Sequence, residues 1–113
     1  MDSEFRATTA PLDDGSVVTL VGTVDRGAKE TLEAAYAEAT SRPGRVVLDF
    51  RGVDYINSTG IAVIVGLLAR ARAEEREIHA FGLSDHYREV FTITRLADFM
   101  TIHDDEEAAV AAR

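Results

Sequence analysis

Two hydroxyl side chains stand where a strand-like run meets a long, mostly apolar segment. The junction reads Asn57-Ser58-Thr59-Gly60 within VVLDFRGVDYINSTGIAVIVGLLARARAE. Such side chains cap helices, because they accept hydrogen bonds from the free backbone N–H groups of the first turn. The same N–H groups and the helix dipole also favour a bound anion. The sequence therefore supports two roles for these hydroxyls: capping the helix and, at Ser58, accepting a phosphate.

A phosphate on Ser58 would act on the surface rather than on the fold. The helix start would tolerate it, but it would add close to two negative charges and considerable bulk. Any protein docking on this turn would meet that charge. Such a phosphate would act as a switch that blocks binding, whereas without it the turn is an ordinary helix cap.

The segments that position this turn alternate between strand and helix patterns. Strands are expected over Phe5 to Ala10, Val17 to Val21, Val46 to Phe50, Ile78 to Leu83 and Phe99 to Ile102. Helices are expected over Gly27 to Ser41, from Ser58 or Thr59 to about Glu75, after Ser84-Asp85, and from Asp104. A hairpin followed by alternating elements predicts an α/β fold with a largely parallel sheet. The turn from Asp54 to Gly60 should then lie beyond the carboxyl end of a strand, where sites form in such sheets.

The helix that begins near Ser58 carries two stripes of apolar residues. Small residues form the first and predict a close approach to a neighbouring element: Ala62, Gly66, Ala69 and Ala73. Larger apolar residues form the second: Ile61, Ile64, Val65 and Leu68. Val63 and Leu67 are left over. They are either part of a deeply buried helix or an exposed apolar patch for a partner.

The composition excludes several classes of function. The chain has 113 residues, which we take as a single domain, and a formal net charge of −8. Twelve Lys and Arg against twenty acids argue against a nucleic-acid surface. No secretory signal or membrane span is seen, so a cytoplasmic protein without direct membrane contact is expected.

No cofactor, metal or catalytic centre is expected. Cysteine is absent, and His79, His86 and His103 are dispersed without metal-ligand spacing. Ser58 lacks the G-x-S-x-G elbow of a hydrolase nucleophile, and no glycine-rich phosphate loop is present. The chain is therefore interpreted as a binding protein and not as an enzyme.

Three segments together resemble a STAS domain of the anti-sigma factor antagonist family. They are LVGTVDRGAKETL, VVLDFRGVDYINSTGIAVIVGLL and IHAFGLSDHYREVFTITRLADFMTIHDDEEAA, and the match runs from about Val17 to Ala112. The resemblance implies a STAS fold, with an N-terminal hairpin, successive β-α units, a mixed, largely parallel sheet and about four helices. It also implies a cycle with an anti-sigma factor that has GHKL-type Ser/Thr kinase activity. The dephosphorylated protein binds this partner and frees sigma, phosphorylation ends the binding, and a phosphatase restores it.

Carried over, the family motif makes Ser58 the acceptor and Thr59 the second candidate. The expected partner surface comprises Thr23, Val24, Asp25, Arg26, Asp54, Asn57, Ser58, Thr59, Gly60, Val63 and Leu67. Asn57 stands where phosphorylated members have Asp, which keeps size and capping ability but removes a charge. Binding is expected to survive that change, and phosphorylation is the step it puts in question. The alternative function is a non-phosphorylated STAS scaffold, or a subunit in a signalling or lipid-transport assembly, as a monomer or weak dimer.

Overall fold

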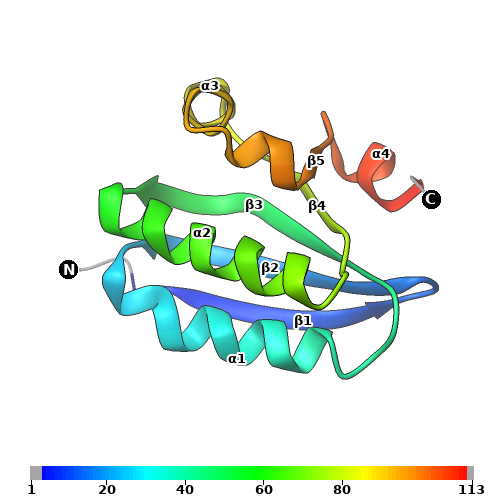
Figure 1. The fold of residues 1–113 in the computed structure, drawn as a ribbon. Coiled ribbons are helices and arrows are strands. Elements are labelled where there is room, and N and C mark those ends of the chain that lie inside the picture. Colours follow the sequence, from blue (N-terminus) through cyan, green and yellow to red (C-terminus); the bar gives the residue numbers. More distant parts are fainter. Residues whose placement is uncertain (1–3, 112–113) are drawn as a thin grey trace.

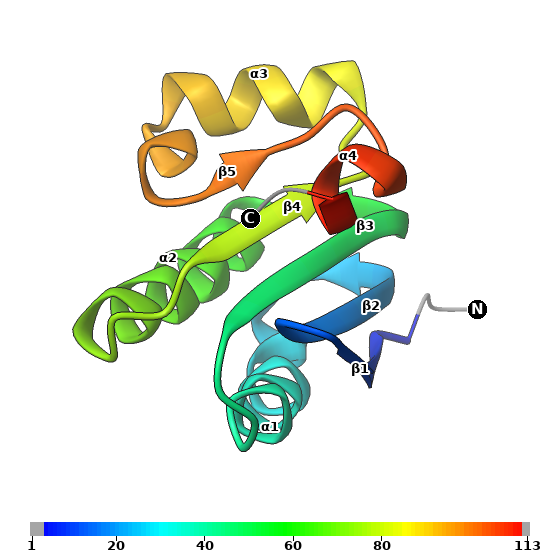
Figure 2. The same ribbon diagram turned by 90° about the vertical axis from the view of Figure 1, so that its right-hand side faces the viewer.

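The computed structural model describes residues 4–111, in which five strands and four α-helices alternate after a hairpin (Figures 1 and 2). The strands are β1 (Arg6–Leu12), β2 (Gly15–Val24), β3 (Arg45–Ile56), β4 (Ile78–Phe81) and β5 (Thr101–Ile102). The helices are α1 (Lys29–Ala39), α2 (Ser58–Ala73), α3 (Asp85–Ile93) and α4 (Glu106–Ala111). Short 3-10 turns over Arg26–Ala28 and Leu96–Phe99 precede α1 and β5. None of the helices within residues 4–111 is long and apolar enough to cross a membrane.

The sheet has the strand order β1-β2-β3-β4-β5. Strands β1 and β2 pair antiparallel, and the remaining neighbours pair parallel. The α/β class, the opening hairpin and the mixed, largely parallel sheet are therefore confirmed. The parallel crossovers bring the carboxyl ends of β2, β3 and β4 to one edge.

Strand β3 is longer than its sequence pattern predicts. It continues past Phe50 to Ile56 because β2 also continues and pairs with it, placing Tyr55 opposite Thr23 and Ile56 opposite Val24. The prediction of a turn from Asp54 to Gly60 is therefore wrong, and Asn57 alone separates β3 from α2.

The two faces of the sheet are covered differently. Alternate β3 residues, such as Val46 and Leu48, lie in the main core under α1, α2 and α3. The residue between them, Val47, packs on the other face with Phe81 and with Ala109 of α4. Figure 2 shows α4 on the side of the sheet away from α1 and α2.

Helix α2 lies on the sheet in a different rotation from the predicted one. Its buried residues are Gly60, Ile64, Leu67, Leu68 and Ala71. The small-residue stripe is exposed instead, and a Cβ added at Gly66 would meet nothing within 4 Å. The prediction that this stripe approaches a neighbour closely is wrong. In α2 the backbone contact that requires glycine is made in the first turn, by Gly60 against the Val24 carbonyl.

A tyrosine of α1 makes a hydrogen bond at the C-terminal end of α2. Tyr36 is buried, and its hydroxyl donates to Glu74 Oε1 at 2.8 Å. The Arg70 guanidinium lies 4.8 Å from the centre of the Tyr36 ring. Burial and the hydrogen bond to Glu74 raise the pKa of Tyr36 to about 12, so the hydroxyl stays protonated and keeps this hydrogen bond even above the ordinary tyrosine pKa of about 10.

Two histidines that are distant in sequence meet beside α4. His79 Nδ1 and His103 Nε2 lie 2.9 Å apart, with the ring planes within 10°, and His79 Nε2 lies 3.1 Å from Glu77 Oε1. The Arg45 guanidinium donates to the last carbonyls of α4, at Ala109 and Val110. His79 and His103 are dispersed in the sequence but are neighbours in the fold. Among residues 4–111 no cluster of three or more metal-binding side chains is found.

Folding stability should fall on acidification because of this pair. Burial lowers the pKa of His103, the charges of His79 and Arg45 add to the effect, and Asp104 and Asp105 oppose it. The unfolded chain then takes up a proton at a higher pH than the folded chain. Stability is complete above the ordinary histidine pKa of about 6.5 and declines as the pH falls from there towards the lower folded pKa.

Urea unfolding between about pH 7.5 and 5 would measure this dependence across the ordinary histidine pKa. His103→Gln should flatten the decline, whereas His86→Gln, at an exposed position, should leave it unchanged. Equal slopes in all three proteins would contradict the assignment.

Candidate functional site

Asn57 caps the helix that begins at Ser58. Its Oδ1 accepts hydrogen bonds from the Gly60 N–H at 2.8 Å and from the Thr59 hydroxyl at 2.7 Å. A carboxylate oxygen could accept both in the same geometry, so Asn in place of Asp preserves the turn. Helix α2 therefore has a side-chain cap, but the amide of Asn57 supplies it, and the prediction that the hydroxyls of Ser58 and Thr59 cap the helix is wrong.

The hydroxyl of Ser58 is left free by this arrangement. Ser58 is the first residue of α2 and is exposed, and its hydroxyl makes no hydrogen bond with any other part of residues 4–111. Thr59 is also exposed, but its hydroxyl is engaged by Asn57. Of the two roles considered for Ser58, side-chain capping is excluded, and an accessible acceptor at a helix N-terminus remains.

The end of β2 contacts the junction of β3 and α2, which we call the Ser58 turn. The Asn57 N–H donates to the carbonyl of Val24 at 3.3 Å. A Cβ added at Gly60 would lie 1.9 Å from the same carbonyl oxygen, so only glycine allows α2 to begin against the β2 backbone. The start of α2 and the end of β2 meet at the left of Figure 1. The loop after β2 is thereby brought beside Ser58.

The residues predicted to contact a partner differ in how exposed they are. Ser58, Thr59, Arg26 and Asp54 are exposed. Thr23, Asp25, Asn57 and Val63 are half-buried, and Asp25 Oδ1 accepts from the Gly27 N–H at 2.8 Å to cap the following 3-10 turn. Val24, Gly60 and Leu67 are buried. Leu67 is only 5% exposed, so the prediction of an exposed apolar patch at Val63 and Leu67 is wrong.

An uncharged strip on α2 replaces that patch. Val65 is 45% exposed, and it continues one face of the helix from Ser58 with Ala62, Gly66 and Ala69. We call these five residues the α2 strip. No charged side chain occurs in α2 before Arg70. Counting helical spacing from Ser58 would have identified this strip in the sequence.

Two aromatic residues near the turn were missed in the sequence. Tyr55 is 55% exposed and lies opposite Thr23 in the β2–β3 pairing. Tyr87, in the first turn of α3, accepts a hydrogen bond from the Ile56 N–H at 2.8 Å. Neither contact follows from local periodicity, because each joins segments that are distant in the chain.

Comparisons with known proteins identify the family to which this chain belongs. The family described as "Mlab, STAS domain" matches residues 8–102, and the chain belongs to the STAS domain family. BtrV of Bordetella bronchiseptica, which carries the name anti-sigma factor antagonist, is 32% identical over 96% of this chain and 94% of its own.

Solved structures share the fold. An anti-sigma factor antagonist from Mycobacterium paratuberculosis matches with a TM-score of 0.76 and 19% identity, covering 97% of this chain and 96% of that one. The phosphorylated form of SpoIIAA from Bacillus matches with a TM-score of 0.66 and 21% identity, covering 93% and 96%. The STAS fold expected from the sequence is thus confirmed.

Proposed function

We propose that this chain is an anti-sigma factor antagonist of the cytoplasm that is switched off by phosphorylation at Ser58. The observation that carries the proposal is the exposed Ser58 hydroxyl, which is unbonded within residues 4–111, while Asn57 provides the cap. The names of its STAS relatives, and the phosphorylated form known for SpoIIAA, support it.

The partner is an anti-sigma factor with GHKL-type Ser/Thr kinase activity. It would dock on the loop from Thr23 to Arg26 and on the α2 strip, which meet at Ser58. The strip offers small, uncharged residues against which another surface can pack closely. The ATP site belongs to the partner, and this chain, a monomer or weak dimer, is its substrate and not an enzyme.

The switch follows from the position of Ser58 at one end of the strip. A phosphate there is compatible with the N-terminal dipole of α2, so the fold survives. The same phosphate would have to lose its hydration when the uncharged strip is covered, which is costly for a buried charge without a partner. Phosphorylation therefore ends binding, and a phosphatase would reverse it.

Incubation with the partner kinase and ATP, followed by intact mass, tests this function. We expect one phosphoryl group on the wild type and on Thr59→Ala, and none on Ser58→Ala. Thr59→Ala is the matched control, because Asn57 still accepts from the Gly60 N–H and the cap remains. A stable complex in which the wild type gains no phosphate would instead identify the non-phosphorylated STAS scaffold or subunit.

A further inference from the structure

Strand β3 extends beyond its neighbour β4 before it reaches the Ser58 turn. The pairing of β3 with β4 ends where Asp49 lies opposite Phe81, whereas β3 itself continues to Ile56. On its β2 side this extension remains paired, up to Ile56 opposite Val24. Within residues 4–111 no strand accompanies it on the β4 side, so the backbone groups there need another partner.

Tyr87 of α3 supplies that partner for Ile56, the last residue of β3. Its hydroxyl accepts from the Ile56 N–H at 2.8 Å and faces the Ile56 carbonyl at 3.4 Å as a donor. Ile56 immediately precedes Asn57, the cap of α2. The turn that carries Ser58 is therefore fixed from two sides, by the Val24 carbonyl on one and by Tyr87 on the other.

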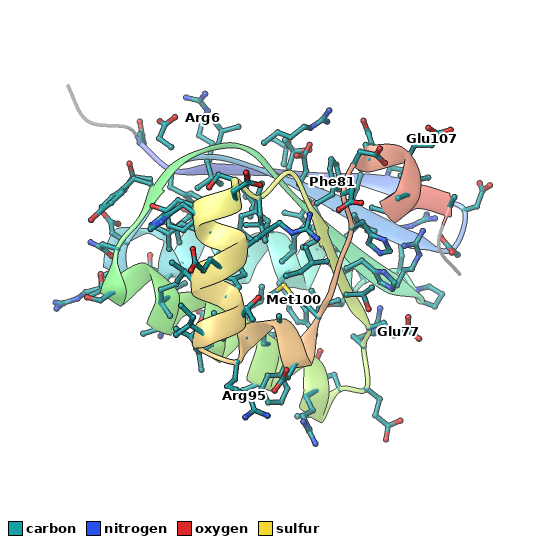
Figure 3. All side chains as sticks on the ribbon, turned by 90° about the horizontal axis from the view of Figure 1, so that it is seen from above. Arg6, Glu77, Phe81, Arg95, Met100 and Glu107 are labelled. Atoms are coloured by element: carbon teal, nitrogen blue, oxygen red, sulfur yellow. The ribbon has the colours of Figure 1, made fainter. Side chains whose placement is uncertain are left out.

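The tyrosine is itself held by the contacts of α3. Its backbone N–H donates to the Ser84 hydroxyl at 3.2 Å, which places Tyr87 in the capped first turn of α3. One turn later the fully buried Phe91 packs edge-on against Phe50, with ring centres 5.9 Å apart. Figure 3 shows α3 lying across the strands, with Arg95 just beyond its C-terminal end. The capped and packed helix α3 thus sets the position of the Tyr87 hydroxyl.

We propose that Tyr87 is a positioning residue for phosphoryl transfer to Ser58, an inference that rests on the proposed function. Phosphoryl transfer depends on aligning the attacking hydroxyl with the phosphate, and small displacements reduce the rate strongly. Without the Tyr87 hydroxyl, the end of β3 loses its fixed point on the β4 side. Ser58 then spends less time in the aligned position, although the docking surface and its chemistry are unchanged.

Tyr87→Phe and Tyr36→Phe form a matched pair for the test. Each removes one hydroxyl that makes a hydrogen bond, but Tyr36 bonds Glu74 at the far end of α2. Steady-state phosphorylation by the partner kinase should show kcat lowered about fivefold in Tyr87→Phe with KM little changed, as expected for one hydrogen bond of ordinary strength. Tyr36→Phe should keep the wild-type kcat.

The possible outcomes separate the inference from the proposed function. A wild-type kcat in Tyr87→Phe, or an equal loss in both variants, would overturn the positioning role while leaving Ser58 as the acceptor. A wild type that gains no phosphate would remove the proposed function, and the inference would fall with it. Urea unfolding of both variants checks that each remains folded under the assay conditions.

Discussion

Gly60→Ala should lower the free energy of unfolding by about 3 kcal/mol, at the upper end of the usual cost of overpacking. The added methyl would lie 1.9 Å from the carbonyl oxygen of Val24 and 2.6 Å from its carbonyl carbon. These are backbone atoms at the end of a central strand, and they cannot move aside as a flexible side chain could. Helix α2 must therefore shift away from β2, which also breaks the hydrogen bond from Asn57 to Val24.

Gly66→Ala on the same helix is the matched control. A Cβ there meets nothing within 4 Å, so the change should raise the free energy of unfolding by about 0.5–1 kcal/mol through helix propensity alone. Urea unfolding of both variants measures the two effects with opposite signs. A Gly60→Ala protein as stable as the wild type would show that α2 does not begin against β2 as described.

Ser58→Asp should weaken binding to the anti-sigma partner by about 100-fold, the scale of a buried charge without a counter-charge. Ser58→Ala should bind as the wild type does, because the hydroxyl makes no hydrogen bond within residues 4–111 that the fold would lose. Aspartate carries less charge than a phosphate, so its effect is a lower limit for the modified serine.

Isothermal titration calorimetry with the partner measures these affinities. Ser41→Asp, at an exposed position beyond the C-terminal end of α1, introduces the same charge away from the site and should leave the affinity unchanged. If Ser58→Asp and Ser58→Ala bind equally well, Ser58 lies outside the docking surface.

The features that the sequence predicted correctly are those set by local patterns. The hairpin, the order of strands and helices, the start of α2 at Ser58 and the cap of α3 at Ser84 all follow from turn residues, apolar runs and capping preferences. The exposed hydroxyl at a helix start follows from the same kind of signal. Resemblance to the STAS family then predicts Ser58, rather than Thr59, as the phosphate acceptor.

The features that the sequence missed depend on partners that are distant in the chain. The extension of β3 needs β2 on one side and Tyr87 on the other, and neither contact is encoded near Ile56. The rotation of α2 was misjudged because small residues were expected to mark the packed face. The sheet instead accepts the larger side chains, such as Ile64 and Leu68, and leaves the small ones exposed.

Release of sigma is the most direct measure of the central claim. A complex of the anti-sigma partner with its sigma factor would be mixed with this chain, either unmodified or fully phosphorylated at Ser58, and free sigma would be followed by size-exclusion chromatography. The unmodified chain should displace sigma, and the phosphorylated chain should leave the complex intact. Equal displacement by both forms would contradict control through Ser58.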